Sequence, residues 1–139
     1  MAVHFEELSF QTSNDFDVID ITELVQVAIL KSGLSDGIVN IFVIGSTASV
    51  STVEFEPNLV KDLKRAMERI APSDIEYSHH MTWGDSNGKS HVRATILGPG
   101  TTVPFKNKTL ITGTWQQIVV LDFDVPSRER RVQLTIIGE

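Results

Sequence analysis

Short runs of β-branched and apolar residues recur along this chain of 139 residues, and they constrain its fold more than any other feature. The runs typical of strands cover residues 38–44, 90–97, 115–123 and 131–137. In 90–97 and 131–137, apolar and polar residues alternate, as in a strand with one buried face. The nearly continuous apolar run 38–44 favours a strand buried on both faces. Strands outnumber helices and do not alternate with them, so we predict an α+β fold with a mostly antiparallel sheet or sandwich and two main helices.

Two segments have the apolar period of an amphipathic helix. In residues 21–29, apolar side chains recur every three or four positions. Asp20 is the predicted N-cap of this helix, and Gly33 is its predicted stop. The second helix is predicted over 56–70, with Pro57 in its first turn.

The chain length fits one domain, residues 1–139, with an ordinary hydrophobic core. Two apolar strands in its last part, 118–123 and 132–137, exceed what two short helices would cover. Subunit association would bury this excess, and a closed barrel that fills its own interior is the alternative.

Composition excludes several classes of site and partner. The chain has no cysteine, which excludes disulfides, thiolate metal sites and cysteine nucleophiles. Its net charge is −6, whereas proteins that bind nucleic acids or anionic membranes generally carry an excess of positive charge. No apolar run is long enough to cross a bilayer, and the first residues lack the features of a signal peptide. We therefore expect a cytoplasmic protein with no nucleic-acid or membrane partner.

Residues 76–93 concentrate the reactive side chains. His79, His80 and His91 lie there, separated by the turn-rich loop 84–88. If the loop folds back, imidazoles from both sides converge, and imidazole is both a common metal ligand and a proton carrier near neutral pH. The spacing matches no known zinc motif, so a solvated or capping role is the alternative.

Hydroxyl and guanidinium groups occur in two further segments. Ser46 and Thr47 follow the run 38–44, where small hydroxyl residues either donate to phosphate oxygens or form an ordinary turn. Arg128 and Arg130 belong to a short basic cluster that either binds phosphate or forms a solvated hairpin.

The run 115–123 and its flanks add further polar groups. Thr114 and Gln116 flank Trp115, which we expect in the core rather than at a ligand. Asp122 and Asp124 share one strand face, where they are either metal ligands or, as we favour, surface charges.

Several short segments, in this order and spacing, match one known pattern. They are Ser46-Thr47-Ala48, Glu54 with Pro57, Tyr77-Ser78-His79, Asn87 with Ser90-His91, Leu97-Gly98, Val103-Pro104, Gly113-Thr114-Trp115-Gln116 and the arginine-rich end before Gly138-Glu139. Together they resemble the YjbQ-type family, whose members are described as secondary thiamine-phosphate synthases. The resemblance covers nearly the whole chain, most clearly from Ile41 to Gly138.

The resemblance implies an α+β subunit that assembles as a homotrimer, with a polar pocket near the subunit boundary. It allows a divalent metal, zinc or magnesium, at His79 and His91. It also implies weak joining of a pyrimidine pyrophosphate to a thiazole phosphate, with release of pyrophosphate. Many members have a histidine where this chain has Gly45. His80, Glu54 or water then completes the metal shell, or no firm metal is held.

The candidate residues fall into two groups. We assign catalytic roles to His79, His91, Glu54 and Arg93. The predicted contacts to a phosphorylated small molecule are Ser46, Thr47, Asn87, Thr114, Gln116, Arg128 and Arg130. Two alternatives stay open, namely a metal-assisted enzyme that acts on another phosphorylated metabolite, and a trimeric binding protein without catalysis.

Overall fold

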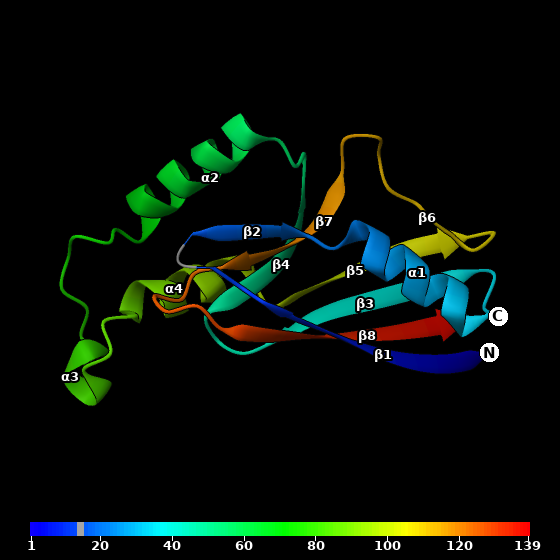
Figure 1. The fold of residues 1–139 in the computed structure, drawn as a ribbon, viewed down its shortest axis with the longest axis horizontal. Coiled ribbons are helices and arrows are strands. Elements are labelled where there is room, and N and C mark those ends of the chain that lie inside the picture. The colour runs from blue at the N-terminus through cyan, green and yellow to red at the C-terminus, as the bar shows by residue number, and fades with distance from the viewer. Residues whose placement is uncertain (14–15) are drawn as a thin grey trace.

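Two antiparallel β-sheets pack face to face in the computed structural model, which describes residues 1–13 and 16–139 (Figure 1). The larger sheet has the order β1-β8-β3-β5-β6. Its strands are β1 (Ala2–Gln11), β8 (Glu129–Gly138), β3 (Gly37–Ile44), β5 (Gly100–Lys106) and β6 (Thr109–Leu110). The smaller sheet has the order β2-β7-β4. Its strands are β2 (Asp17–Asp20), β7 (Gln117–Asp122) and β4 (Ala48–Val53).

The helices lie against the smaller sheet and along the edges of the sandwich. They are α1 (Thr22–Ser32), α2 (Pro57–Ile70), α3 (His80–Trp83) and α4 (Gly88–Leu97). The α+β class with antiparallel sheets is therefore as predicted. None of the described helices combines the length and the apolar character that a bilayer crossing requires.

Strand β7 is buried on both faces and forms the centre of the fold. Ile118 and Val120 face the larger sheet and belong to the main core, together with side chains from β3, β8 and α1. Val119 and Leu121 face the other way and pack with Ala94 of α4 in a second cluster. The excess of apolar strand that we expected to need a partner subunit is thus covered within one chain.

The two predicted helices form, with one change at a cap. Helix α1 ends at Gly33, which has φ 73°, a left-handed conformation that glycine adopts without strain. Its N-cap position is Ile21 rather than Asp20, although Asp20 Oδ1 accepts a hydrogen bond from the Thr22 backbone N at 2.9 Å. Helix α2 has Pro57 in its first turn, and the side chain of the preceding glutamate accepts hydrogen bonds from two of its backbone N–H groups.

The prediction of a strand over 90–97 is wrong, because this segment is helix α4. Its buried residues include Ser90, Arg93 and Ala94, a spacing of three and four positions that matches a helix face. Of the three apolar residues that suggested a strand, Ala94 is buried, whereas Val92 and Ile96 are 39% and 54% exposed. A helix that buries polar and small side chains therefore produced an alternating apolar pattern.

The strand predictions differ from the structure in two further details. The strand 38–44 forms as β3, but it buries one face only, and Ile38 and Phe42 are 45% and 43% exposed. The predicted strand over 115–123 begins at Gln117, and Trp115 is 73% exposed instead of lying in the core. The strand over 131–137 forms within β8 and buries its apolar face as predicted.

Candidate functional site

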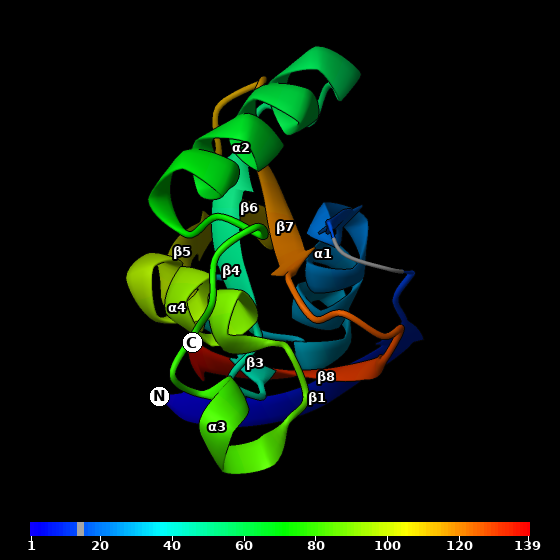
Figure 2. The same cartoon turned by 90° about the vertical axis from the view of Figure 1, so that its left-hand side faces the viewer.

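One cavity of about 380 Å³ collects polar side chains from three parts of the chain. Its walls come from the β3–β4 loop, from the segment that contains α3 and the start of α4, and from the β7–β8 connection with the start of β8. These parts meet at the end of the molecule that carries α3 (Figure 2). The lining residues are Gly45, Ser46, Thr47, His79, Trp83, Asp85, Asn87, His91, Asp124, Arg128 and Arg130.

Seven of the residues that the sequence predicts for the site line this one cavity. They are Ser46, Thr47, His79, Asn87, His91, Arg128 and Arg130. They are distributed over more than eighty positions of the chain, so the fold brings them together.

The imidazoles of His79 and His91 lie against each other. Their ring centroids are 4.6 Å apart, with the rings tilted by 59°. His79 precedes α3, His91 lies near the start of α4, and the chain between them passes through left-handed Gly84 and Ser86. His79 Nε2 also lies 3.7 Å from Asp85 Oδ1. The turn-rich loop thus folds back and places the two rings side by side.

Two arginine–aspartate pairs join Thr47 in one hydrogen-bond network. Arg130 Nη2 donates to Asp122 Oδ1 at 2.5 Å and to Thr47 Oγ1 at 2.7 Å. Thr47 Oγ1 donates to Asp124 Oδ2 at 3.0 Å, and Arg128 Nε donates to the same oxygen. Asp122 and Asp124 are both 0% exposed. The expectation that they are surface charges is therefore wrong, because arginines from the following segment pair with them.

The surroundings of Asp124 favour the charged form of its carboxyl group. Burial alone would raise the pKa of Asp124, but hydrogen bonds from Val125 N, Thr47 Oγ1 and Arg128, with the positive charge of Arg128, hold that pKa below its ordinary value. A guanidinium has five N–H donors, so contacts to one carboxylate leave others for a ligand. The side chain of Arg128 is 48% exposed, which leaves it open to the cavity.

The start of α4 is fixed to the end of the smaller sheet. Ser90 Oγ donates to the backbone carbonyl that follows β7. In one orientation of its amide, Asn87 Nδ2 donates to Asp124 Oδ1 at 3.4 Å, and in the alternative orientation it donates instead to Asp85 Oδ1 at 2.9 Å. These contacts hold the neighbouring His91 beside the cavity.

Gly45 faces Arg130 directly. A Cβ atom at residue 45 would lie 2.9 Å from Arg130 Nη1, and the backbone there has φ +136°, a conformation that other residues rarely adopt. The guanidinium thus occupies the space that a side chain at this position would need.

Three predicted site residues, Glu54, Thr114 and Gln116, lie at the opposite end of the smaller sheet. Strand β4 begins beside the cavity at Ala48 and ends at Val53, about 16 Å away for a strand of this length. Glu54 follows that far end and is exposed. Gln116 is beside it and donates from Nε2 to the hydroxyl of a β4 threonine at 3.1 Å. Within one chain, the structure does not bring these residues to the cavity.

Arg93 is 0% exposed and lies outside the cavity. Its Nε and Nη2 donate to the Ala71 carbonyl at 3.1 Å and 2.8 Å, and Nη2 donates to Glu68 Oε1 at 2.8 Å. Hydrogen bonds from the Ser73 hydroxyl and backbone N, with a smaller effect of Arg93, lower the pKa of Glu68 to about 2. Arg93 therefore connects α4 to the end of α2 and is not part of the cavity wall.

Besides Gly45, the cavity is lined by three residues that the sequence does not assign to the site, namely Trp83, Asp85 and Asp124. Trp83 and Asp85 belong to the histidine-rich segment and so lie near a recognisable signal. Trp83 is 74% exposed, so its indole ring is available to a ligand. Asp124 has no such signal, because its burial depends on its pairing with Arg128.

The residues present do not fit a firmly held metal ion. Among the described residues, no group of three or more His, Cys, Asp or Glu side chains is placed to hold one. Gly45 offers no ligand, and the positive Arg130 side chain lies where one would project. His80 does not complete a shell, because its Nδ1 accepts from the Ser86 backbone N at 3.2 Å in a different hollow.

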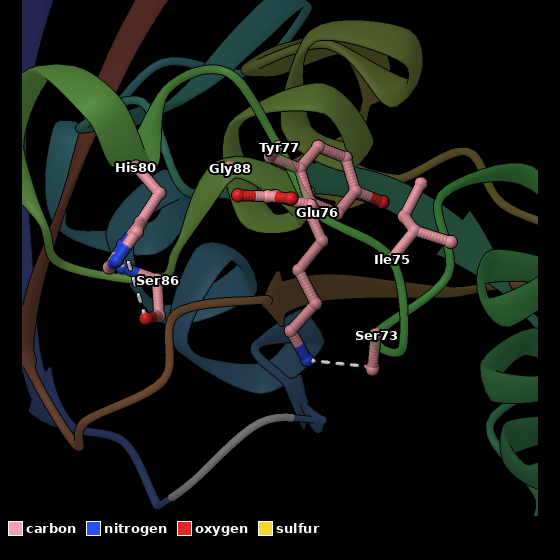
Figure 3. Close-up of a pocket in the computed structure, with 8 residues that line it drawn as sticks. Ser73, Ile75, Glu76, Tyr77, His80, Ser86 and Gly88 are labelled. Carbon is pink, nitrogen blue, oxygen red and sulfur yellow. Dashed lines mark hydrogen bonds between the residues drawn. The ribbon is translucent and has the colours of Figure 1, made fainter.

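That second hollow, of about 260 Å³, lies between residues 73–77 and the loop before α4 (Figure 3). Figure 3 shows His80 and Ser86 on one side and Tyr77, Ile75 and Ser73 on the other. Lys89 is the one cationic residue other than histidine among its described lining residues, and its Nζ donates to Ser73 Oγ at 3.1 Å. The cavity with two arginines and two adjacent imidazoles is the stronger candidate for chemistry.

A model of the family described as UPF0047 protein YjbQ-like matches residues 6–139. The chain belongs to this family. A UPF0047 protein of Methanothermobacter thermautotrophicus is 37% identical over 100% of this chain and 95% of its own length. The UPF0047 protein YugU of Bacillus subtilis is 30% identical over 94% of this chain and 97% of its own.

Solved structures of UPF0047 relatives have the same fold. A YjbQ-like protein of unknown function from Sulfolobus solfataricus superposes with a TM-score of 0.94, at 33% identity and 99% coverage of both chains. A YjbQ/UPF0047 family protein from Clostridium acetobutylicum gives a TM-score of 0.86, at 34% identity, with 95% and 99% coverage. Both the family resemblance and the α+β fold are thus confirmed.

Proposed function

We propose that the cavity binds a phosphorylated small molecule and that the His79–His91 pair exchanges a proton with it. The observation that carries this proposal is the convergence of two guanidiniums, two imidazoles and small hydroxyls in one cavity. Its volume of about 380 Å³ suits a metabolite, since small-molecule sites commonly span roughly 300–1,000 Å³. A cytoplasmic location goes with this proposal, because phosphorylated metabolites are intracellular compounds.

The phosphate would lie against Arg128 and Arg130. Arginine donors suit phosphate because the planar guanidinium can bond two oxygens at once. Ser46 lines the same cavity and its hydroxyl adds a short donor, whereas the single proton of the Thr47 hydroxyl goes to Asp124 Oδ2. Asp122 and Asp124 fix the two guanidiniums in position, which lowers the entropy cost of ordering them around a ligand.

The reaction we propose is the one that the family resemblance implies. The C–O bond between the pyrimidine methyl carbon and pyrophosphate breaks, and the thiazole nitrogen forms a C–N bond to that carbon. Negative charge builds up on the departing pyrophosphate, where Arg128 and Arg130 would stabilise it. His79 or His91, in its protonated form, would donate a proton to the same leaving group.

Thiamine-phosphate formation from purified precursors tests this reaction. We expect product from the wild type and from His4→Ala, which removes a histidine paired with Glu6 on β1, far along the chain from the cavity residues. In His91→Ala the rate should fall about tenfold or more, in the range of a lost acid–base group. Wild-type product formation no greater than that of His91→Ala would refute the synthase proposal.

The same assay separates two other functions. Release of phosphate or pyrophosphate from a single phosphorylated compound, without its partner substrate, would indicate a hydrolytic enzyme. Tight, stoichiometric binding of a phosphorylated compound that is not converted would indicate a binding protein.

We also propose that the chain self-associates, as the homotrimer that the family resemblance implies. The outer face of the larger sheet supports this proposal. Val3, Ile137, Ile38 and Pro104 are aligned across four neighbouring strands, and Phe5 lies beside them with 65% of its surface exposed. Rows of exposed apolar side chains on a sheet are typical of protein interfaces.

A further inference from the structure

A smaller hollow of about 250 Å³ adjoins the cavity and is apolar in character. Its walls include Phe42 of β3, Ala94 and Thr95 of α4, and Pro99 before β5. Its described lining residues include no charged side chain. The Phe42 side chain is 43% exposed, so part of its apolar surface is open to an occupant.

Gly45 and Ser46 line both hollows. The cationic cavity and the apolar hollow therefore share a wall made by the β3–β4 loop. A ligand bound at this loop can contact both.

The glycine at position 45 determines what this junction can hold. A side chain there would project to within 2.9 Å of Arg130 Nη1 and so into the cavity side of the junction. With glycine, the shared wall consists of backbone at this point, and the guanidinium can approach a ligand that extends past it.

We propose that the two hollows form one extended site for a phosphate monoester whose apolar group lies against Phe42 and α4. This inference rests on the proposed function, because it takes the phosphate to lie at Arg128 and Arg130. It adds a second subsite, which is apolar and contacts the apolar group of the ligand. The apolar group gains by leaving water, and the loop at Gly45 and Ser46 sets the distance between the two ends.

Calorimetric titration with inorganic phosphate and with phenyl phosphate tests the extended site. We expect phenyl phosphate to bind about tenfold more tightly, because the phenyl ring buries apolar surface that inorganic phosphate lacks. In Arg128→Gln, both ligands should bind more weakly and the preference should remain.

A matched set of variants on α4 locates the phenyl ring. Thr95→Trp should fill the apolar hollow and abolish the tenfold preference, with phosphate affinity unchanged. Thr95→Val controls for the lost hydrogen bond from Thr95 Oγ1 to the His91 carbonyl, and it should keep the preference. Ile96→Trp adds the same indole at the next position, which is 54% exposed and does not line the hollow, and it should keep the preference too.

Two results overturn the extended site alone. One is equal affinity of the wild type for the two ligands, as expected if a second copy of the chain fills the hollow. The other is a preference that survives in Thr95→Trp. If the wild type binds neither ligand, the phosphate site of the proposed function fails, and the extended site fails with it.

Discussion

Gly45 and Arg130 together decide the chemistry available beside the two histidines. Because Arg130 Nη1 lies where a side chain at residue 45 would project, this wall of the cavity presents a cation instead of a metal ligand. A guanidinium repels a divalent ion and attracts a phosphate. His79 and His91 are therefore better placed for proton transfer than for holding a metal.

The metal content of the purified protein tests whether His79 and His91 hold a metal ion. Tag-free protein should contain clearly less than one equivalent of zinc or another transition metal per chain, and His79→Ala should not differ from it. The reason is that two imidazoles near an arginine leave a tetrahedral zinc site short of ligands. The measurement is elemental analysis after dialysis. Near-stoichiometric metal in the wild type, lost in His79→Ala, would contradict this reading.

The site residues were predictable where a local pattern marks them. His79 and His91 flank a turn-rich loop, and Ser46 and Thr47 follow a recognisable strand. Asp124 was not predictable in this way, because a carboxylate at a strand end is normally solvated. Its burial depends on Arg128 folding back onto it, which is a tertiary contact.

At the level of an element, helix α4 likewise could not be predicted from a local pattern, because its burial depends on tertiary contacts. Its buried face includes Ser90 and Arg93, which are 0% exposed, while the apolar Ile96 points outward. Hydrophobic periodicity finds elements whose buried face is apolar, as in α1 and β8. It fails for α4 because hydrogen bonds, such as those of Arg93 to the Ala71 carbonyl, satisfy the buried polar groups.

The hydrogen bonds that Glu68 accepts from Ser73, and with a smaller effect from Arg93, predict a pH-dependent stability. The pKa of Glu68 is about 2, below its ordinary value of 4.5, so its contribution is full above pH 4.5 and is lost as the pH falls through about 2. Glu68→Gln should lower the free energy of unfolding by about 1 kcal/mol at pH 7, since this side chain is 37% exposed and solvent screens its charge. The difference from the wild type should shrink as the pH falls below 4.5.

Urea unfolding across this pH range is the measurement, and Asp62→Asn is the matched control. Asp62 lies on the same helix and pairs with Arg65, but both side chains are about two-thirds exposed, 64% and 68%. Its loss should therefore change stability by less than about 0.5 kcal/mol. A Glu68→Gln effect that is constant from pH 7 to pH 2 would show that Glu68 acts by packing and not by charge.

At the scale of the whole molecule, the packing of the two sheets determines which apolar side chains remain exposed. Strand β7 is covered on both faces, by the larger sheet and by α4, so the excess predicted at 118–123 is internal. Exposed apolar side chains lie on β1 and β3 and on the outer faces of α1 and α4, and of the described side chains of α2 only Met67 is buried. Counting apolar strands therefore placed the excess at strands whose apolar side chains the packing of layers covers.

Self-association through the outer face of the larger sheet can be measured directly. Size exclusion with light scattering should give the wild type the mass of three chains of 15.4 kDa. Ile38→Lys places a charge within the apolar row and should shift the mass towards one chain, because an interface does not bury an unpaired charge. Met81→Lys adds the same charge at a residue that is 84% exposed on α3, and it should leave the mass unchanged. A wild type with the mass of one chain, or equal effects of the two lysines with folding verified by circular dichroism, would rule out this interface.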